Sequence, residues 1–258
     1  MSQSFLADPA IADAAVQAAG LHGDETVVEP GPGLGLLTER LVARAARVIA
    51  VELDRELAAS LRRYLVGPNL EVIQQDVLRF EPEAHGLLDY VLVSNLPYQV
   101  STAVLTRFMV QVRPPRRMVL MLQREVAERL LAIPGEMSFL AVQTQLLTEP
   151  RLVRRVPSGA FVPRPNVDSA LVRFDLRPSP AAGVADVPGF LALVRAGFTQ
   201  PRKQLRNSLA QGLGREPSWV GALLEQAALD GVRRAQELTI EEWARLHPIY
   251  TAAMDGER

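Results

Sequence analysis

The sequence contains no cysteine, which excludes disulfide frameworks, thiolate zinc sites and cysteine nucleophiles. Its three histidines, His22, His85 and His247, lie far apart, so we expect no histidine-based metal site. No run of about 18 apolar residues is free of charge, which excludes a membrane-spanning helix. The first residues show no basic stretch followed by an apolar run, so we expect no secretory signal and a cytoplasmic protein.

Lysine is almost absent, because Lys203 is the single lysine among 28 basic residues. The net charge of −1 conceals two halves of opposite sign. Residues 1–98 carry 7 basic and 14 acidic side chains, whereas residues 99–258 carry 21 and 15. The acidic half could hold a small molecule while the basic half contacts phosphate. The charge by itself nevertheless favours scattered surface arginine.

Strands and helices alternate along the first half of the chain. The patterns predict strands at 27–28, 47–52, 70–74, 89–94 and 118–122, and helices at 8–21, 36–45, 54–64, 100–110 and 124–132. Such alternation predicts an α/β fold with a mostly parallel sheet and helices on both faces. Two further strands, at 152–156 and 169–174, have no helix between them and predict an antiparallel pair at one sheet edge.

The pattern changes after residue 176. Residues 177–183 are rich in proline and alanine and predict a linker. Only helical patterns follow, at 188–198, 201–212, 217–228 and 239–253. We therefore expect a cofactor-binding catalytic domain over residues 1–177 and a small all-helical domain over residues 184–258.

A glycine-rich turn, EPGPGLG over residues 29–35, links the first strand to the next helix. Glycine lets the backbone turn tightly and approach a ligand closely. The turn lies at the carboxyl end of a strand, where open α/β sheets bind ligands. Its spacing is G-x-G-x-G, so the dinucleotide fingerprint is not met. By itself the turn is equally explained as a connection without a ligand.

Acidic residues follow the next two strands. Glu52 ends one strand about 20 residues after the turn. A carboxylate there can accept hydrogen bonds from both ribose hydroxyls of an adenosine ligand. Asp54 better fits the cap of the following helix. Asp76 follows the third strand, and its side-chain oxygen can accept a hydrogen bond from the exocyclic amine of adenine. No phosphate-binding Lys-Ser/Thr pair follows the turn, so S-adenosylmethionine fits better than a nucleotide polyphosphate.

The motif Asn95-Leu96-Pro97-Tyr98 follows the strand DYVLVS. Pro97 restricts the backbone so that preceding carbonyls can point into a site. The side-chain carbonyl of Asn95 can accept a hydrogen bond from an exocyclic amine, and Tyr98 offers a flat face on which a base can stack. This combination suits N6-methylation of adenine, in which positioning rather than a charged base carries the rate.

These motifs resemble those of the S-adenosylmethionine-dependent rRNA adenine dimethyltransferases. FVPRPNVDS over residues 161–169 resembles the F-x-P-x-P-x-V-D-S segment of the KsgA-type small-subunit enzymes. QPRKQLRNSL over residues 200–209 resembles their R-R-K-x-x-R-N-S-L segment. The resemblance runs from Gln3 to about Trp243. It implies a Rossmann-like class I methyltransferase sheet with a small helical C-terminal domain that contacts rRNA.

The resemblance also implies site residues. Ser4 stands where the family usually has asparagine, and Phe161 matches an aromatic residue that meets the target base opposite Tyr98. The catalytic set is Asn95, Leu96, Pro97, Tyr98 and Phe161. The set implied for S-adenosylmethionine is Ser4, Leu6, Glu29, Gly31, Gly33, Glu52, Asp76 and Asn95.

Basic clusters become candidate phosphate contacts once the motif is considered. A helix over 201–212 would place positions 202, 203 and 206 on one face. The expected RNA-binding set is Arg113, Arg116, Arg117, Arg154, Arg155, Arg164, Arg202, Lys203 and Arg206. For any single arginine, an ion pair with nearby glutamate is the better explanation.

Three functions are compatible with the sequence. The first is N6,N6-dimethylation of adenines in small-subunit (16S) rRNA, within the subunit or its precursor, by a monomer. The second is the same reaction on large-subunit (23S) rRNA, as in macrolide-resistance enzymes. The third is a non-catalytic assembly factor for the small subunit. The complete glycine turn and the intact motif at 95–98 favour an enzyme.

Overall fold

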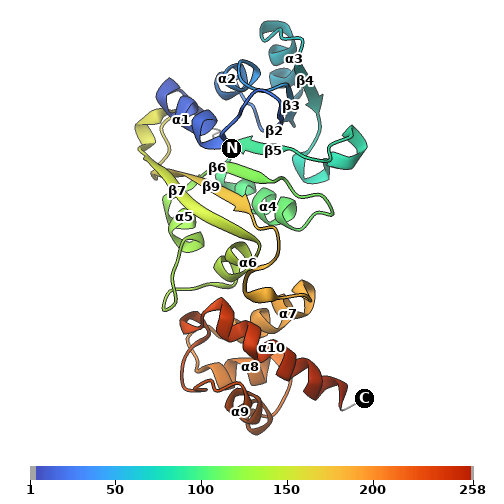
Figure 1. The fold of residues 1–258 in the computed structure, drawn as a ribbon. Coiled ribbons are helices and arrows are strands. Elements are labelled where there is room, and N and C mark those ends of the chain that lie inside the picture. Colours follow the sequence, from blue (N-terminus) through green and yellow to red (C-terminus); the bar gives the residue numbers. More distant parts are fainter. Residues whose placement is uncertain (1–3, 257–258) are drawn as a thin grey trace. The chain divides into compact units, whose positions relative to one another are not determined.

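The computed structural model describes residues 4–256 and divides the chain into two compact units (Figure 1). The first, here called the sheet unit, comprises the described residues up to Ala127 together with Glu149–Leu176. The second, the helical unit, comprises Glu128–Thr148 and the described residues from Arg177 onward. The predicted division after residue 177 assigned residues 128–148 to the first domain. The structure groups them with the C-terminal helices, because Ala141, Val142 and Leu146 are buried in the core of those helices.

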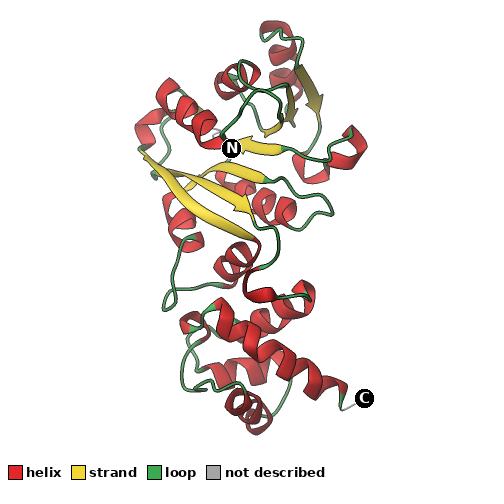
Figure 2. Ribbon diagram, viewed as in Figure 1, coloured by secondary structure: helices red, strands yellow, loops and turns green. Residues whose placement is uncertain are grey.

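The sheet unit is built on a seven-stranded mixed sheet (Figure 2). Its order is β4-β3-β2-β5-β6-β9-β7. The strands are β2 (Thr26–Pro30), β3 (Arg47–Glu52), β4 (Leu70–Gln74), β5 (Val91–Ser94), β6 (Arg117–Gln123), β7 (Thr148–Val156) and β9 (Ser169–Leu176). The first five in spatial order pair in parallel, and β9 runs antiparallel to β6. The α/β architecture is confirmed, and the two late strands are neighbours at one edge of the sheet.

A second, two-stranded sheet pairs segments far apart in sequence. β1 (Phe5–Leu6) lies antiparallel to β8 (Phe161–Val162), with Leu6 opposite Phe161. The Ala160 carbonyl also accepts the backbone N–H groups of Ala7 and Asp8, at 2.8 and 3.2 Å. This pairing was not predicted, because two residues are too short to show a strand pattern.

Helices of the sheet unit begin and end where local chemistry dictates. They are α1 (Pro9–Ala19), α2 (Leu36–Val42), α3 (Arg55–Tyr64), α4 (Tyr98–Met109) and α5 (Arg124–Leu130), which continues into the helical unit. Short 3-10 turns lie at η1 (Val77–Arg79), η2 (Pro82–His85) and η3 (Ser158–Ala160). The Asp8 side chain caps α1, which ends two residues before the predicted position because Gly20 adopts the left-handed conformation. Asp54 caps α3, as predicted.

The core of the sheet unit contains alternate strand residues packed against α1 and α2. Val27, Val48 and Val91 contribute from successive parallel strands, and Ile11 and Leu41 from the helices. All five side chains are almost completely buried. The resulting rigid sheet fixes the carboxyl ends of β2, β3, β4 and β5, where the polar residues of interest follow.

The helical unit has an apolar core of its own, around the fully buried Trp243. Its helices are α6 (Phe139–Leu147), η4 (Ala181–Gly183), α7 (Val187–Gly197), α8 (Leu205–Leu213), α9 (Pro217–Gln226), η5 (Ala235–Glu237) and α10 (Ile240–Asp255). α6 was not predicted. None of the helices in residues 4–256 is long and apolar enough to cross a bilayer.

One predicted helix of this unit is shorter than expected. Residues 200–203 form a turn, in which the Lys203 N–H donates to the Gln200 carbonyl at 3.0 Å. α8 therefore begins at Leu205 rather than at 201. Tertiary contacts set the position at which α8 begins. The Leu205 N–H donates to the Arg233 carbonyl, and the Arg206 N–H donates to the Gly231 carbonyl.

Candidate functional site

A cavity of about 590 Å³ lies at the carboxyl ends of the parallel strands of the sheet unit. Its size is in the range of small-molecule sites. Its walls combine a backbone turn, several polar side chains and two aromatic rings. The lining residues are Ser4, Gly31, Val51, Glu52, Leu53, Asp54, Gln75, Asp76, Val77, Asn95, Leu96, Pro97, Tyr98, Gln99, Val100, Gln123 and Phe161.

The glycine turn between β2 and α2 requires its glycines. Gly31 and Gly33 have φ angles of 63° and 57°, in the left-handed region that L side chains rarely adopt. A Cβ on Gly31 would lie 2.7 Å from the Leu96 side chain. The turn is held to the next strand by the Gly31 N–H, which donates to the Val51 carbonyl at 2.9 Å. The turn and the motif that follows β5 therefore pack directly against each other.

Glu52 connects the glycine turn to the start of α3. Its carboxylate is buried and accepts the N–H groups of Gly33, at 3.2 Å, and Asp54, at 2.9 Å. Both donors are backbone N–H groups, so these bonds to the carboxylate do not depend on another side chain. This geometry places a carboxylate with further acceptor capacity on the cavity wall.

Asp76 lies beyond the end of β4 and also lines the cavity. One carboxylate oxygen accepts the Leu78 N–H at 2.9 Å and thereby caps η1. The cap fixes the side chain without using its full acceptor capacity. The structure thus brings together three groups that the sequence places after three different strands: the turn, Glu52 and Asp76.

Glu29 lies behind the turn in a small cavity of about 30 Å³, which Ser4, Leu6, Gly31 and Asn95 also line. The side chain is only 1% exposed, and its Oε2 atom has no hydrogen-bond partner. Burial raises the pKa of the Glu29 carboxyl to about 8, and the Glu52 carboxylate adds to this increase while the Thr38 hydroxyl opposes it. The acid is therefore mostly neutral at pH 7, and a cation placed beside it would favour its ionised form.

The motif at 95–98 forms the junction between β5 and α4. The Ser94 hydroxyl donates to the Pro30 carbonyl at 2.7 Å and ties the end of β5 to β2. Asn95 borders both cavities, and Pro97 occupies the N-cap position of α4 without a side-chain capping bond. Tyr98 begins α4, and its phenol oxygen lies 2.6 Å from the Ser169 hydroxyl of β9. Leu96 is buried and fills the space above Gly31.

Phe161 reaches the same cavity from the second sheet. The ring is 3% exposed and stands opposite Leu6 in the pairing of β1 with β8. Ser4 lines the cavity as well, whereas Gln3 lies outside the described residues. All the predicted catalytic and cofactor residues that the structure describes therefore border one or both cavities.

Several lining residues were not identified from the sequence. Leu53 and Val77 each follow a predicted acidic residue, and Gln123 ends β6. The rule that ligands bind at the carboxyl ends of parallel strands would have indicated all three. Ser169 had no such signal, because its contact with Tyr98 joins residues 71 positions apart.

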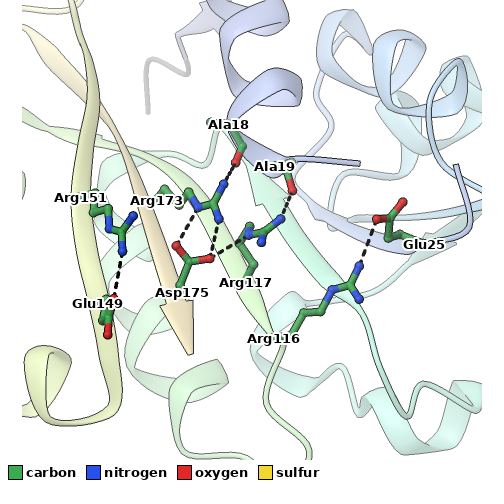
Figure 3. Close-up of polar contacts among 9 residues, drawn as sticks. All are labelled: Ala18, Ala19, Glu25, Arg116, Arg117, Glu149, Arg151, Arg173 and Asp175. Atoms are coloured by element: carbon green, nitrogen blue, oxygen red, sulfur yellow. Dashed lines mark hydrogen bonds and ion pairs between the residues drawn. The ribbon is translucent and has the colours of Figure 1, made fainter. Parts of the chain in front are cut away.

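Two of the predicted RNA contacts form ion pairs within the sheet unit (Figure 3). Arg116 pairs with the buried Glu25 and with Asp89, both at 3.1 Å. Arg117 pairs with Asp175 at 2.8 Å and donates to the Ala19 carbonyl at the end of α1. These partners are consistent with a structural role for both guanidinium groups, and RNA contact by them stays a prediction.

Arg173 completes this arrangement. It donates to the Ala18 carbonyl at 2.8 Å and pairs with Asp175 (Figure 3). Although burial acts to raise it, hydrogen bonds from Arg173 and Arg117 lower the pKa of the Asp175 carboxyl. Two cations at the C-terminal end of α1 also complement its macrodipole.

The remaining predicted RNA contacts are exposed. Arg113, Arg154 and Arg155 lie on the surface of the sheet unit, and Arg164 donates to the Ser158 hydroxyl at 2.9 Å. Arg202, Lys203 and Arg206 are exposed in the helical unit. The premise that these three share a helical face is wrong, because Arg202 and Lys203 precede α8.

Comparison with known proteins gives a consistent picture. The family model described as "Ribosomal RNA adenine dimethylase" matches residues 1–250. "Ribosomal RNA small subunit methyltransferase A" of Dehalococcoides mccartyi is 42% identical over 254 residues, which cover 97% of this chain and 87% of the relative. The protein of the same name from Bacillus licheniformis is 40% identical over 258 residues, with coverage of 95% and 88%.

Solved structures match over almost the whole chain. The 23S rRNA methyltransferase ErmE is 32% identical, with a TM-score of 0.75 and coverage of 95% of this chain and 98% of that one. A dimethyladenosine transferase from Plasmodium falciparum has a TM-score of 0.82 and covers 96% and 98%, at 22% identity. The second likeness supports the fold alone. Both matches agree with a Rossmann-like sheet followed by a helical region.

Proposed function

The chain belongs to the ribosomal RNA adenine dimethylase family, and we propose that it transfers methyl groups from S-adenosylmethionine to N6 of adenines in small-subunit rRNA. The observation that carries the proposal is the meeting of Asn95, Tyr98 and Phe161 on one cavity with Glu52 and Asp76. Carboxylates that suit an adenosine ligand and aromatic rings that suit a base thus share one space. The relatives of about 40% identity are named for the small subunit, which favours that substrate.

The donor set fits the cofactor. Glu52 presents a buried carboxylate for ribose hydroxyls, and Asp76 presents an oxygen for the adenine amine. Gly31 and Gly33 permit the left-handed turn beside the ligand, and Glu29, Ser4 and Leu6 line the smaller space next to it. When bound, S-adenosylmethionine supplies an electrophilic methyl group. Its positive charge also suits a wall that carries Glu29 and Glu52.

The residues after β5 act on the target amine. The Asn95 side-chain carbonyl accepts a hydrogen bond from N6–H, which favours a pyramidal nitrogen and restores its lone pair for attack. Pro97 holds the backbone of the motif in a fixed conformation. Tyr98 and Phe161 hold the base between two rings. No charged general base is required, because positioning and preorganised dipoles lower the barrier.

Access of the adenine to this site requires that it leave its stack. The exposed basic residues Arg113, Arg154, Arg155 and Arg164, and the group at 202–206, supply phosphate contacts that position the RNA. We extend the proposal to 16S rRNA within the small subunit or its precursor as the substrate, a monomer as the acting form and the cytoplasm as its place. The helical unit then serves mainly in RNA contact.

Two alternatives are less well supported. A large-subunit rRNA substrate is suggested by the likeness to ErmE, but that identity is 32% against 42% for a small-subunit relative. A non-catalytic assembly factor would not need the complete turn or an open cavity beside Asn95 and Tyr98. A role in assembly alongside catalysis is compatible with all these observations.

The test is methyl transfer from labelled S-adenosylmethionine to purified unmethylated small and large ribosomal subunits, with modified nucleosides identified by mass spectrometry. Dimethyladenosine in the small subunit alone is the expected result. Label in the large subunit alone would favour the second function. Cofactor binding without transfer to either subunit would favour the assembly factor.

A further inference from the structure

Two aromatic rings on the cavity are held by two consecutive residues. Tyr98 comes from the start of α4 and Phe161 from β8, and the two are 63 positions apart in sequence. Asp168 ends the segment between Phe161 and β9, and Ser169 is the first residue of β9. Ser169 makes a hydrogen bond with the Tyr98 phenol, and Asp168 accepts one from the backbone of the turn that precedes Phe161.

Ser169 fixes the Tyr98 ring. The two hydroxyl oxygens are 2.6 Å apart, and Ser169 is completely buried. Ser169 is the first residue of β9 and stands opposite Gln123 of β6, so its backbone is held by the sheet. A phenol bonded to a fixed partner cannot swing about χ1 without losing that bond. The sheet thereby fixes the position of the phenol oxygen and the direction in which the Tyr98 ring points.

Asp168 fixes the segment that carries Phe161. Its Oδ1 accepts the Ser158 N–H at 3.0 Å, at the start of the turn η3 that leads directly into Phe161. The Asp168 carbonyl accepts the Arg124 N–H at 3.0 Å, which anchors the aspartate to the end of β6. The loop therefore cannot shift at Ser158 without breaking a bond to the same strand pair that holds Ser169.

We propose that Asp168 and Ser169 are positioning residues, which set where Tyr98 and Phe161 lie around the target base. The inference rests on the proposed function, because it assumes that a base lies between the rings. Its physical basis is that the two rings are held by two adjacent residues, Asp168 just before β9 and Ser169 at its start. A displacement of the reacting amine by about 1 Å can cost about a hundredfold in rate.

The effect is expected in kcat rather than in KM for RNA. Phosphate contacts elsewhere on the surface provide most RNA affinity, whereas the rings act on the flipped base. Ser169→Ala removes the partner of the Tyr98 phenol and should lower kcat about tenfold with little change in KM. Asp168→Ala should act in the same direction. Asp168→Asn keeps an oxygen acceptor for the Ser158 N–H and should restore most of kcat.

A double-mutant cycle tests the Ser169 arm directly. Tyr98→Phe keeps the ring but removes the phenol, so it deletes the same hydrogen bond from the other side. If that bond is the cause, the double variant Tyr98→Phe/Ser169→Ala should have a kcat close to that of either single variant. Multiplied losses would overturn the inference, because they would show that the two side chains act independently.

Thr148→Val provides a matched control. Thr148 is completely buried, and its hydroxyl donates to the Thr144 carbonyl at 2.8 Å, so this variant also loses one buried hydrogen bond. Its kcat should equal that of the wild type. Melting temperatures and S-adenosylmethionine affinity, measured for every variant, identify any loss that arises from unfolding or from the cofactor site.

The outcomes separate the two proposals. A wild-type protein that methylates no rRNA adenine would refute the proposed function. An active wild type whose Ser169→Ala and Asp168→Ala variants keep full kcat would refute the positioning role alone. Equal losses in Asp168→Asn and Asp168→Ala would refute the hydrogen-bond assignment for the Phe161 arm.

Discussion

One group of arginines in the sheet unit and one group in the helical unit have different environments. In the sheet unit, Arg117 and Arg173 are less than one-third exposed and are paired with Asp175 and with carbonyls at the end of α1. In the helical unit, Arg202 and Arg206 are exposed beside the start of α8. The same residue type thus holds elements together in one group and is available to solvent in the other, and the helical unit also contains a paired arginine, Arg233, which contacts Glu242. A count of basic residues therefore overstates the surface that can contact phosphate.

The two units also differ in their polar interiors. The sheet unit buries acids, Glu25, Glu29 and Glu52, at or near strand ends. The core of the helical unit is apolar and centred on Trp243. Buried acids are costly unless they are bonded or neutral, so the presence of Glu29 and Glu52 at the two cavities distinguishes the unit in which we place the chemistry. Four predictions test this contrast, from the largest effect to the smallest.

Asn95→Ala should break the proposed chemistry of the sheet unit. Loss of the carbonyl acceptor is expected to lower kcat for methyl transfer about 100-fold or more, with RNA affinity unchanged. Single-turnover transfer and RNA binding measure the two quantities. Asn69→Ala is the control, since the Asn69 amide only donates to the Val42 and Ala45 carbonyls. That variant should lose stability but keep its kcat, and near-normal turnover in Asn95→Ala would contradict the acceptor role.

Arg117→Ala should show that this arginine stabilises the sheet unit. Removal leaves the Ala19 carbonyl without the guanidinium and leaves Asp175 with Arg173 alone. We expect a loss of about 2 kcal/mol in the free energy of unfolding, less than for a fully buried pair because the side chain is 21% exposed. Denaturant titration measures it, with the exposed Arg202→Ala as the control. Equal stabilities of the two variants would remove the distinction between the two arginines.

Glu29→Gln should change how stability depends on pH. The pKa of Glu29 is raised from 4.5 to about 8 on folding, so the folded protein retains a proton that the unfolded chain releases. Stability is therefore lost as pH rises from about 4.5 to about 8. The neutral amide should remove this slope and so raise the free energy of unfolding near pH 7. Exposed Glu39→Gln is the control, and parallel pH profiles for wild type and Glu29→Gln would show that Glu29 folds without retaining its proton.

Alanine at Arg202, Lys203 and Arg206 should weaken RNA binding about tenfold and lower the slope of log affinity against log salt by about 2–3. The expected cause is the loss of phosphate contacts from the helical unit. A control variant with alanine at the exposed Arg44, Arg55 and Arg63 of the sheet unit should keep both affinity and slope. Identical slopes for the two triple variants would place the RNA elsewhere.

Much of the fold was predictable because its signals are local. The strands 47–52 and 70–74 have the predicted bounds, and Asp8 and Asp54 cap the predicted helices. Hydrophobic runs, capping residues and glycine turns act over a few residues, so they can be read without knowledge of the fold. The convergence of Glu52, Asp76 and Asn95 also followed, because parallel strands place their carboxyl ends on one edge.

Other features depend on contacts between distant segments. α6 was missed, and residues 128–148 were assigned to the wrong unit, because its apolar residues pack with helices more than 40 positions later. The start of α8 was misplaced because the turn before it is held by carbonyls at 231 and 233. The ion pairs of Arg116 and Arg117 reach partners 91 and 58 positions away.

The sequence by itself determined the order of the strands of the large sheet and of most helices, the glycine turn and the polar residues at the strand ends, because each arises from neighbouring residues. The tertiary structure alone decided which arginines are paired, that β1 and β8 bring Leu6 opposite Phe161, and that Ser169 meets the Tyr98 phenol. The physical reason is that a hydrogen bond or ion pair depends on separation in space. Residues tens of positions apart are brought together by the packing of the whole unit, and a short sequence pattern does not encode that packing.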